Sequence, residues 1–237
     1  MNEDGYLLVE NFLSKEDHNY FLNVCDTVYQ QALAHPDNEY YSWYDKGHLN
    51  KIQGACDFKK EFLKLASHPT LVTKAKELLN TSQDIDIFIS KFFPMMPNGG
   101  ISTLMHQDNY YFRGDPKRMV SCAVYLQDTS KENGCLRVAK GSHKRGVVPH
   151  NQPSAHESLI KWIPDSVLEE YDVIDFELPA PYAVFFNINS IHGCYQNNSN
   201  NTRFSLAWEY VESTNQDVLQ VNHISFDRNR TIHYDLS

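Results

Sequence analysis

The spacing of hydrophobic and polar residues changes character near position 84. Before it, apolar residues recur at intervals of three and four, after a Ser-Lys-Glu-Asp sequence at Ser14 that resembles a helix capping box. This pattern predicts an amphipathic helix over 15–33. Two further helices are predicted over 58–67 and 70–80, with a proline between them.

Beyond position 84 the chain consists of short alternating or β-branched apolar segments, which is the pattern of β-strands. Asn133-Gly134 is a strong turn signal between two of them. Several short strands after a helical opening predict an all-β core, a sandwich or barrel, with helices packed outside it. The predicted strands lie around 85–89, 120–127, 135–138, 183–188 and 203–211, with a further candidate at 219–226.

Two stretches fit neither pattern. Residues 36–57 are aromatic-rich, polar and irregular, which predicts a loop that covers something. Residues 143–170 are rich in His, Pro, Ser and Asn and predict an inserted loop that shapes an entrance. Because no internal repeat is present, we expect one domain over 1–237, with helical support roughly over 1–83 and the β core roughly over 84–237.

Composition narrows the classes of partner. The chain has 237 residues, of which 41% are hydrophobic, enough to bury a sizeable core. A formal net charge of −9 argues against nucleic acid or an anionic membrane as the main partner. Five cysteines without a CxxC spacing, and an acidic start without the basic residues of a targeting peptide, predict a cytoplasmic protein with reduced thiols. Monomer and homodimer stay equally open.

A His-x-Asp sequence is the main candidate for chemistry. If His106 and Asp108 lie on a strand, the i, i+2 spacing points both side chains to one face, where they can share a metal ion. A second imidazole comes 86 residues after the first, at His192. Two histidines and one carboxylate form the facial triad of non-haem iron(II) enzymes, which leaves coordination positions open for a cosubstrate and O2.

Arg203 indicates which cosubstrate this metal site would bind. It lies eleven residues after His192 and opens a predicted strand, with Ser205 on the same face. A guanidinium and a hydroxyl together suit the distal carboxylate of 2-oxoglutarate. Taken alone, Arg203 would favour an ordinary salt bridge; after a His-x-Asp and a distant His it favours the cosubstrate role.

Over about 100–211 the sequence resembles the phytanoyl-CoA dioxygenase family. Four stretches carry the resemblance: His106-Gln107-Asp108, Asn133-Gly134-Cys135-Leu136 with Lys140-Gly141-Ser142-His143, His192-Gly193 with Asn197-Asn198-Ser199, and Arg203 eleven residues after the second His. Lys140 stands where the family commonly has Pro, and Cys194 where it commonly has Ser. Neither departure touches an expected ligand.

The resemblance implies a double-stranded β-helix, the jelly roll of cupin-like proteins, with N-terminal helices packed outside. It also implies iron(II) on His106, Asp108 and His192, 2-oxoglutarate on Arg203, and O2 as the oxidant. The intact Asp108 argues against halogenation, because halogenating relatives replace that carboxylate with a small residue.

Three further residues are weaker candidates. Lys91 could help to bind the cosubstrate, if its strand lies next to the His-x-Asp strand, or could be a surface lysine. Tyr110 shares strand parity with the proposed ligands and could face the substrate. Arg113 could contact substrate, but solvent is at least as good a neighbour for it.

The expected activity is hydroxylation of a small metabolite or natural-product intermediate, with release of succinate and CO2. Desaturation and ring closure use the same ligand frame and stay open. The alternative is a non-redox metal-binding jelly roll, such as an isomerase, hydrolase or ligand sensor. Such a protein would have no need of Arg203, so that residue is the discriminating feature.

Overall fold

The computed structural model describes residues 1, 3–45, 48–100, 102–151 and 161–214. Its strands are β1 (Tyr6–Glu10), β2 (Tyr41–Asp45), β3 (His48–Gln53), β4 (Ile85–Met95), β5 (Thr103–His106), β6 (Met119–Tyr125), β7 (Leu136–Ala139), β8 (Val173–Asp175), β9 (Tyr182–Asn187), β10 (His192–Cys194) and β11 (Arg203–Glu212). Its helices are α1 (Lys15–Ala34), α2 (Ala55–Phe58), α3 (Lys60–Ala66), α4 (Pro69–Leu79), α5 (Asp108–Phe112) and α6 (Asp165–Leu168), with a 3-10 helix at Ser142–Arg145.

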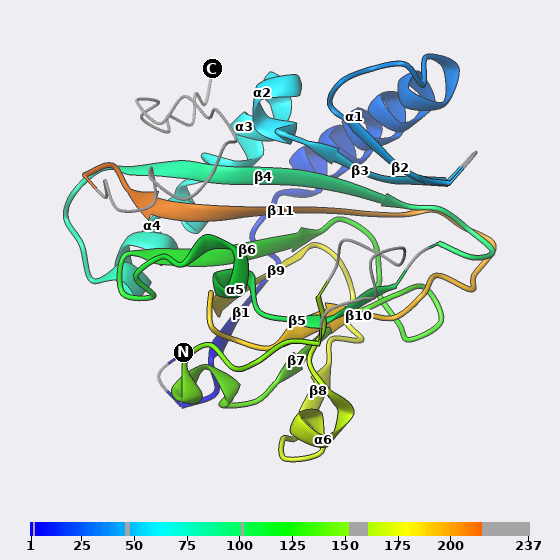
Figure 1. The fold of residues 1–237 in the computed structure, drawn as a ribbon. Coiled ribbons are helices and arrows are strands. Elements are labelled where there is room, and N and C mark those ends of the chain that lie inside the picture. The colour runs from blue at the N-terminus through cyan, green and yellow to red at the C-terminus, as the bar shows by residue number, and fades with distance from the viewer. Residues whose placement is uncertain (2, 46–47, 101, 152–160, 215–237) are drawn as a thin grey trace.

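The strands form two antiparallel sheets, with the larger above the smaller in Figure 1. Residues of both sheets line a cavity. The larger sheet has seven strands in the order β1-β9-β6-β11-β4-β3-β2. The smaller sheet has four, in the order β5-β10-β7-β8. Six of these nine strand pairings join strands that are not consecutive in sequence, as expected for a jelly roll, so residues far apart in the chain meet at the cavity.

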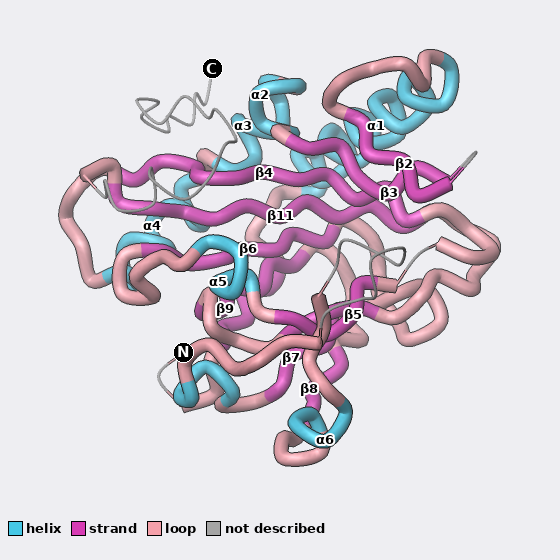
Figure 2. The backbone as a smooth tube through the Cα atoms, in the orientation of Figure 1, coloured by secondary structure: helices cyan, strands magenta, loops and turns pink. Residues whose placement is uncertain are grey.

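The N-terminal helices cover the outer face of the larger sheet, as Figures 1 and 2 show for α1 and α3. Strand β11 shows how the sequence produces this arrangement. From Phe204 to Tyr210 its even-numbered side chains are large, apolar and buried in the core shared with the helices, while its odd-numbered residues from Arg203 to Glu209 line the cavity. The even set is Phe204, Leu206, Trp208 and Tyr210. The period of two in the sequence therefore separates a stabilising face from a binding face.

The predicted helices and the main core strands are present. Ser14 caps α1, with its hydroxyl oxygen accepting a hydrogen bond from the Asp17 N–H at 3.0 Å. Pro69 is the first residue of α4, where its missing N–H costs nothing. The fold class predicted from the sequence, an antiparallel β core with helices outside, is confirmed. The strand candidate at 219–226 lies outside the described residues.

Two predicted boundaries are wrong. Segment 36–57 is not an irregular loop, since it contains the β2–β3 hairpin and α2. The region 1–83 is not helical support alone, because β1 pairs with β9 and β3 pairs with β4, both in the larger sheet. The insert at 143–170 contains short helices at its two ends, and 152–160 within it lie outside the described residues.

The five cysteines are free thiols, four of them buried. No described helix is both long and apolar enough to cross a lipid bilayer.

Candidate metal centre

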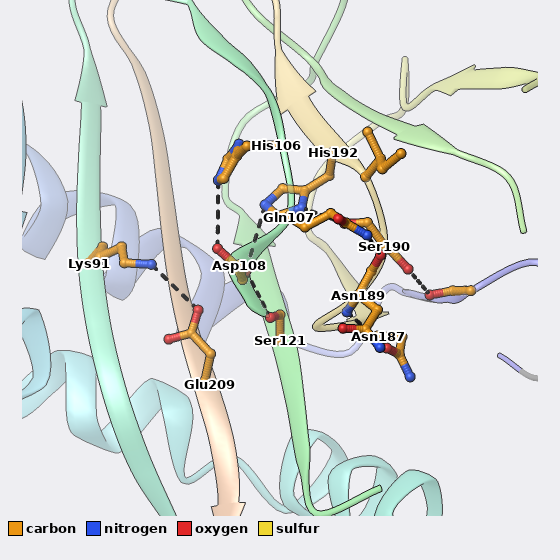
Figure 3. A network of polar contacts seen from close by, with 12 residues as sticks. Lys91, His106, Gln107, Asp108, Ser121, Asn187, Asn189, Ser190, His192 and Glu209 are labelled. Atoms are coloured by element: carbon orange, nitrogen blue, oxygen red, sulfur yellow. Dashed lines mark hydrogen bonds and ion pairs between the residues drawn. The ribbon is translucent and has the colours of Figure 1, made fainter. Parts of the chain in front are cut away.

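His106, Asp108 and His192 come together at one end of the smaller sheet (Figure 3). His106 closes β5 and His192 opens β10, and the two are paired across these strands. The Nε2 atoms of His106 and His192 lie 3.6 and 3.7 Å from the two carboxylate oxygens of Asp108. One ligand atom from each of the three residues lies within 4.8 Å of the others, so a single metal ion can contact all three.

The expected strand geometry of His-x-Asp is wrong, although the two side chains do meet. Strand β5 ends at His106, and Asp108 is the first residue of the short helix α5. An acidic side chain is favourable at a helix start because the helix dipole is positive there. Gln107 anchors the turn, donating from its side chain to the Gly146 carbonyl at 2.8 Å and the Asn189 carbonyl at 2.5 Å.

Hydrogen bonds orient both imidazoles toward Asp108. His106 Nδ1 lies 2.8 Å from the Leu104 carbonyl oxygen, and His192 Nδ1 lies 3.1 Å from the Ser190 carbonyl oxygen. A carbonyl can only accept, so each Nδ1 carries the proton and each Nε2 presents a lone pair. Burial lowers the pKa of His192 to about 4, which keeps it in the neutral form that binds metals.

The Asp108 carboxylate is held in its ionised form. Burial alone would raise the pKa of Asp108. At the acid pH where Asp108 would take up a proton, however, the neighbouring imidazoles are protonated, and the charges of His192, Lys91 and His106 more than offset burial and hold the pKa of Asp108 well below its usual range. The Ser121 hydroxyl also donates to Asp108 Oδ2 at 3.0 Å. Two oriented nitrogens and one ionised carboxylate fit the donor set that iron(II) takes in a facial triad.

Arg203 is a buried cation that lines the same cavity as the metal-ligand candidates, with 3% of its surface exposed. Its guanidinium donates to Ser205 Oγ at 2.5 Å and to the Gly134 carbonyl at 2.9 Å, with further contacts to the Asn133 carbonyl and Met95 Sδ. Within the described part of the chain no carboxylate forms an ion pair with it. A buried, uncompensated guanidinium calls for an anion, and a ligand carboxylate in the cavity would supply one.

The cavity that joins these groups has a volume of about 460 Å³. The metal-ligand candidates, Arg203 and Ser205 all line it. Strand β3, in the segment expected to be a loop, contributes Lys51 to its wall. This volume is in the range of pockets that bind metabolites and small cofactors.

Comparison with known proteins decides the family. The family model described as phytanoyl-CoA dioxygenase matches residues 1–205. The chain belongs to this family. The family and the reaction class predicted from the sequence, a non-haem iron(II)- and 2-oxoglutarate-dependent oxygenase, are thereby confirmed.

The proteins that this chain resembles in sequence are named for more than one substrate. A probable phytanoyl-CoA dioxygenase of Caenorhabditis elegans is 26% identical over 99% of this chain and 83% of its own length. An L-proline trans-4-hydroxylase of Streptomyces griseoviridis is 27% identical over 70% of this chain and 69% of its own. The chain spans 44% to 83% of the length of the phytanoyl-CoA dioxygenases that it matches.

The fold is also that of solved structures. EctD from S. alaskensis, in a crystal structure with 2-oxoglutarate and 5-hydroxyectoine, superposes with a TM-score of 0.71 at 21% identity, covering 90% of this chain and 74% of EctD. The jelly-roll architecture expected from the resemblance to the phytanoyl-CoA dioxygenases is confirmed by this likeness.

Of the three weaker site candidates, one lines the cavity and two do not. Lys91 lines the cavity, but not for the expected reason, since β4 lies in the larger sheet and β5 in the smaller one. Tyr110 lies on α5 outside the cavity lining and packs against His150, with ring centroids 4.1 Å apart and ring planes tilted by 36°. Its neighbour Tyr111 lines the cavity instead. Arg113 ends α5 in a left-handed conformation with an exposed side chain, away from the cavity.

Proposed function

We propose that this chain hydroxylates a small molecule, with iron(II) bound by His106, Asp108 and His192 and the distal carboxylate of 2-oxoglutarate bound by Arg203 and Ser205. The observation that carries the proposal is the shared cavity. Three oriented metal-ligand candidates line it, and so does a buried guanidinium without a carboxylate partner among the described residues.

When bound, iron(II) and 2-oxoglutarate would supply the activation of O2 and the oxidation of a C–H bond, with succinate and CO2 as coproducts. The protein residues bind and orient. Ser121 holds the Asp108 carboxylate, the Leu104 and Ser190 carbonyls hold the two imidazoles, and Arg203 fixes the far end of the cosubstrate. The substrate would lie in the remaining space, whose walls include Ile89, Phe112 and Phe186.

A small free substrate is favoured by the dimensions of the site. A cavity of about 460 Å³ has to hold the cosubstrate as well as the substrate. The L-proline hydroxylase and EctD relatives, whose names and bound molecules are small free metabolites, support this size class. We further propose a monomer or homodimer in a reducing compartment such as the cytoplasm, which the free thiols support, with no nucleic acid or membrane partner.

The test uses protein purified without oxygen and given iron(II), 2-oxoglutarate and a panel of small metabolites. Exposure to O2 should form succinate and a product heavier than its substrate by one oxygen atom. Asp108→Ala should abolish both iron binding and succinate formation, whereas Asp115→Ala, an exposed aspartate beyond α5, should change neither. Wild-type protein that binds iron but forms no succinate with any substrate, or Asp108→Ala with unchanged iron affinity, would refute the proposal.

A further inference from the structure

A buried ion pair in the cavity has no role in the metal or cosubstrate sites described above. Lys91 Nζ on β4 lies 3.4 Å from Glu209 Oε1 on β11. Glu209 is 1% exposed, and its second carboxylate oxygen, Oε2, has no hydrogen-bond partner in the described part of the chain. Figure 3 shows the two side chains reaching toward each other beside Asp108 and Ser121. Both residues line the cavity, so a ligand held there would lie beside the pair.

The pair lies at the metal end of the cavity. Glu209 is paired across β11 and β6 with Ser121, which donates a hydrogen bond to Asp108. The Cα atoms of Arg203 and Glu209 are six residues apart on the same strand, about 20 Å at the usual rise per residue, and Ser205 and Ala207 line the cavity between them. The register of β4 and β11 shifts between Trp208 and Tyr210, a bulge of the kind that re-aims side chains beside active sites. Glu209 is therefore too far from Arg203 to share a ligand carboxylate with it.

Stability of the fold does not account for this pair. A buried carboxylate oxygen that lacks a partner is unfavourable, and burial raises the pKa of Glu209 to about 7. Lys91 also has unused capacity, because an ammonium has three N–H donors and the hydrogen bond to Glu209 uses one. The pair thus presents a free acceptor and free donors side by side, next to the metal centre.

We propose that Lys91 and Glu209 recognise the substrate through one neutral group, a hydroxyl or a primary carboxamide, that donates to Glu209 Oε2 and accepts from Lys91 Nζ. A hydroxyl and a carboxamide each donate and accept, whereas an ammonium only donates and a carboxylate only accepts. The inference rests on the proposed function and adds the substrate class to it. It assigns Lys91 to substrate binding, in place of the cosubstrate binding that the sequence suggested.

The charges around the pair exclude ionic ligand groups. A ligand ammonium at Glu209 would face two positive charges, those of Lys91 and Lys51. The two lysines lie close together, because burial first and the charge of Lys91 second lower the pKa of Lys51 to about 8. A ligand carboxylate at Lys91 would face Glu209 and Asp108. Like charges at short range beside a carboxylate as buried as Glu209 are strongly unfavourable, so a neutral group is preferred on both sides.

The experiment measures the binding of five one-ring fragments by ligand-observed NMR: benzyl alcohol, benzamide, benzylamine, benzoate and toluene. Binding of all five is measured with Zn(II), which supports no oxidation, and with 2-oxoglutarate, so that the cosubstrate occupies Arg203. The metal-free protein, in which benzoate can bind Arg203, is measured with the other four fragments only. The alcohol and the amide should bind about tenfold or more tightly than the other three, as expected for hydrogen bonds to charged groups. Their affinities relative to each other identify which neutral group the site takes.

The double variant K91M/E209L removes both charges together, so that neither is left buried alone. It should bind all five fragments with similar affinity. The matched control is R118M/E212L. It removes another ion pair of β11, between Arg118 Nε and Glu212 Oε2 at 2.7 Å, and neither residue lines the cavity. This control should keep the preference for the alcohol and the amide.

Three results would overturn the inference: tightest binding of benzylamine or benzoate to the wild type, an unchanged preference in K91M/E209L, or loss of 2-oxoglutarate binding in K91M/E209L. The last would place the pair in the cosubstrate site. Failure of the proposed function is a separate result, because it would appear as wild-type protein that binds neither metal nor 2-oxoglutarate, whatever its fragment preference in the metal-free state.

Discussion

Replacing Arg203 with methionine should weaken 2-oxoglutarate binding strongly while changing the stability of the ligand-free protein little. Methionine keeps much of the length and apolar volume of arginine and removes the charge. The prediction separates a cosubstrate residue from a structural one, because a structural arginine would show the opposite pattern.

The magnitude follows from the hydrogen bonds of the guanidinium. It has five N–H groups, and four of them are directed to Asn133, Ser205, Met95 and Gly134. One N–H on Nη1 and the Ser205 hydroxyl proton are left for a ligand carboxylate. Loss of a buried charge-assisted hydrogen bond with its charge costs about 3 kcal/mol, or about a hundredfold in Kd.

The stability of the ligand-free variant should change by less than about 1.5 kcal/mol. The methionine variant loses the hydrogen bonds to the Gly134 and Asn133 carbonyls, but it also no longer buries a charge that lacks a carboxylate partner. These two effects oppose each other and are of similar size.

The assay is isothermal titration of 2-oxoglutarate into anaerobic iron(II)-loaded protein, together with urea unfolding without ligand. Wild-type protein at a hundred times its Kd should gain about 2.7 kcal/mol of stability from the ligand, and the variant almost none at that concentration. The control is Arg137→Met, which breaks a partly exposed pair with Asp175 and should leave 2-oxoglutarate affinity unchanged. Wild-type affinity in Arg203→Met, or a loss of several kcal/mol of stability without ligand, would refute the reasoning.

Three further predictions concern the same cavity. Ser121→Ala removes the hydroxyl that orients Asp108 and should weaken iron(II) binding about 10- to 100-fold in a chelator competition, with unchanged affinity contradicting that role. Lys51 should react with an acylating reagent with a midpoint near pH 8, because burial lowers its pKa and the reactive neutral amine forms above that pH; a mass-spectrometric midpoint above pH 10 would contradict this. Gly193→Ala would place a Cβ 2.5 Å from the Thr103 carbonyl oxygen between the strands that carry both histidines, and should lower iron affinity and Tm, whereas Gly114→Ala, with neighbours at 3.6 Å or more, should lower neither.

Much of the core was predictable because its strands have one face on helices and one on the cavity. This produces the period of two seen from Ile85 and again from Arg203. The hairpin inside 36–57 was missed because β2 and β3 lie at the edge of the sheet and their pairing shifts register twice. Register shifts break the alternation on which a strand prediction depends.

The candidate ligands were found from residue type and spacing, but their supporting contacts were not. The roles of Gln107 and Ser121 depend on partners 82 and 13 residues away, which no local pattern indicates. The strand rule also misplaced Tyr110, because the chain leaves the strand at Gln107 and starts a helix. A sequence signal did exist there: an acidic residue that precedes a run of aromatics can open a short helix as readily as extend a strand.

Strand β11 shows how a protein can maintain unsatisfied charges in a binding site. Its even-numbered face buries four large apolar side chains against the helices, each worth about 1.5–3 kcal/mol. Its odd-numbered face carries Arg203 and Glu209, each with hydrogen-bonding capacity left unused, at a cost of about 1–3 kcal/mol per group. The stabilisation from the even-numbered face exceeds the cost of the odd-numbered face, so the strand stays in place without ligands. Cosubstrate at one end and substrate at the other would remove the two costs separately, and each ligand should therefore stabilise the protein in the absence of the other.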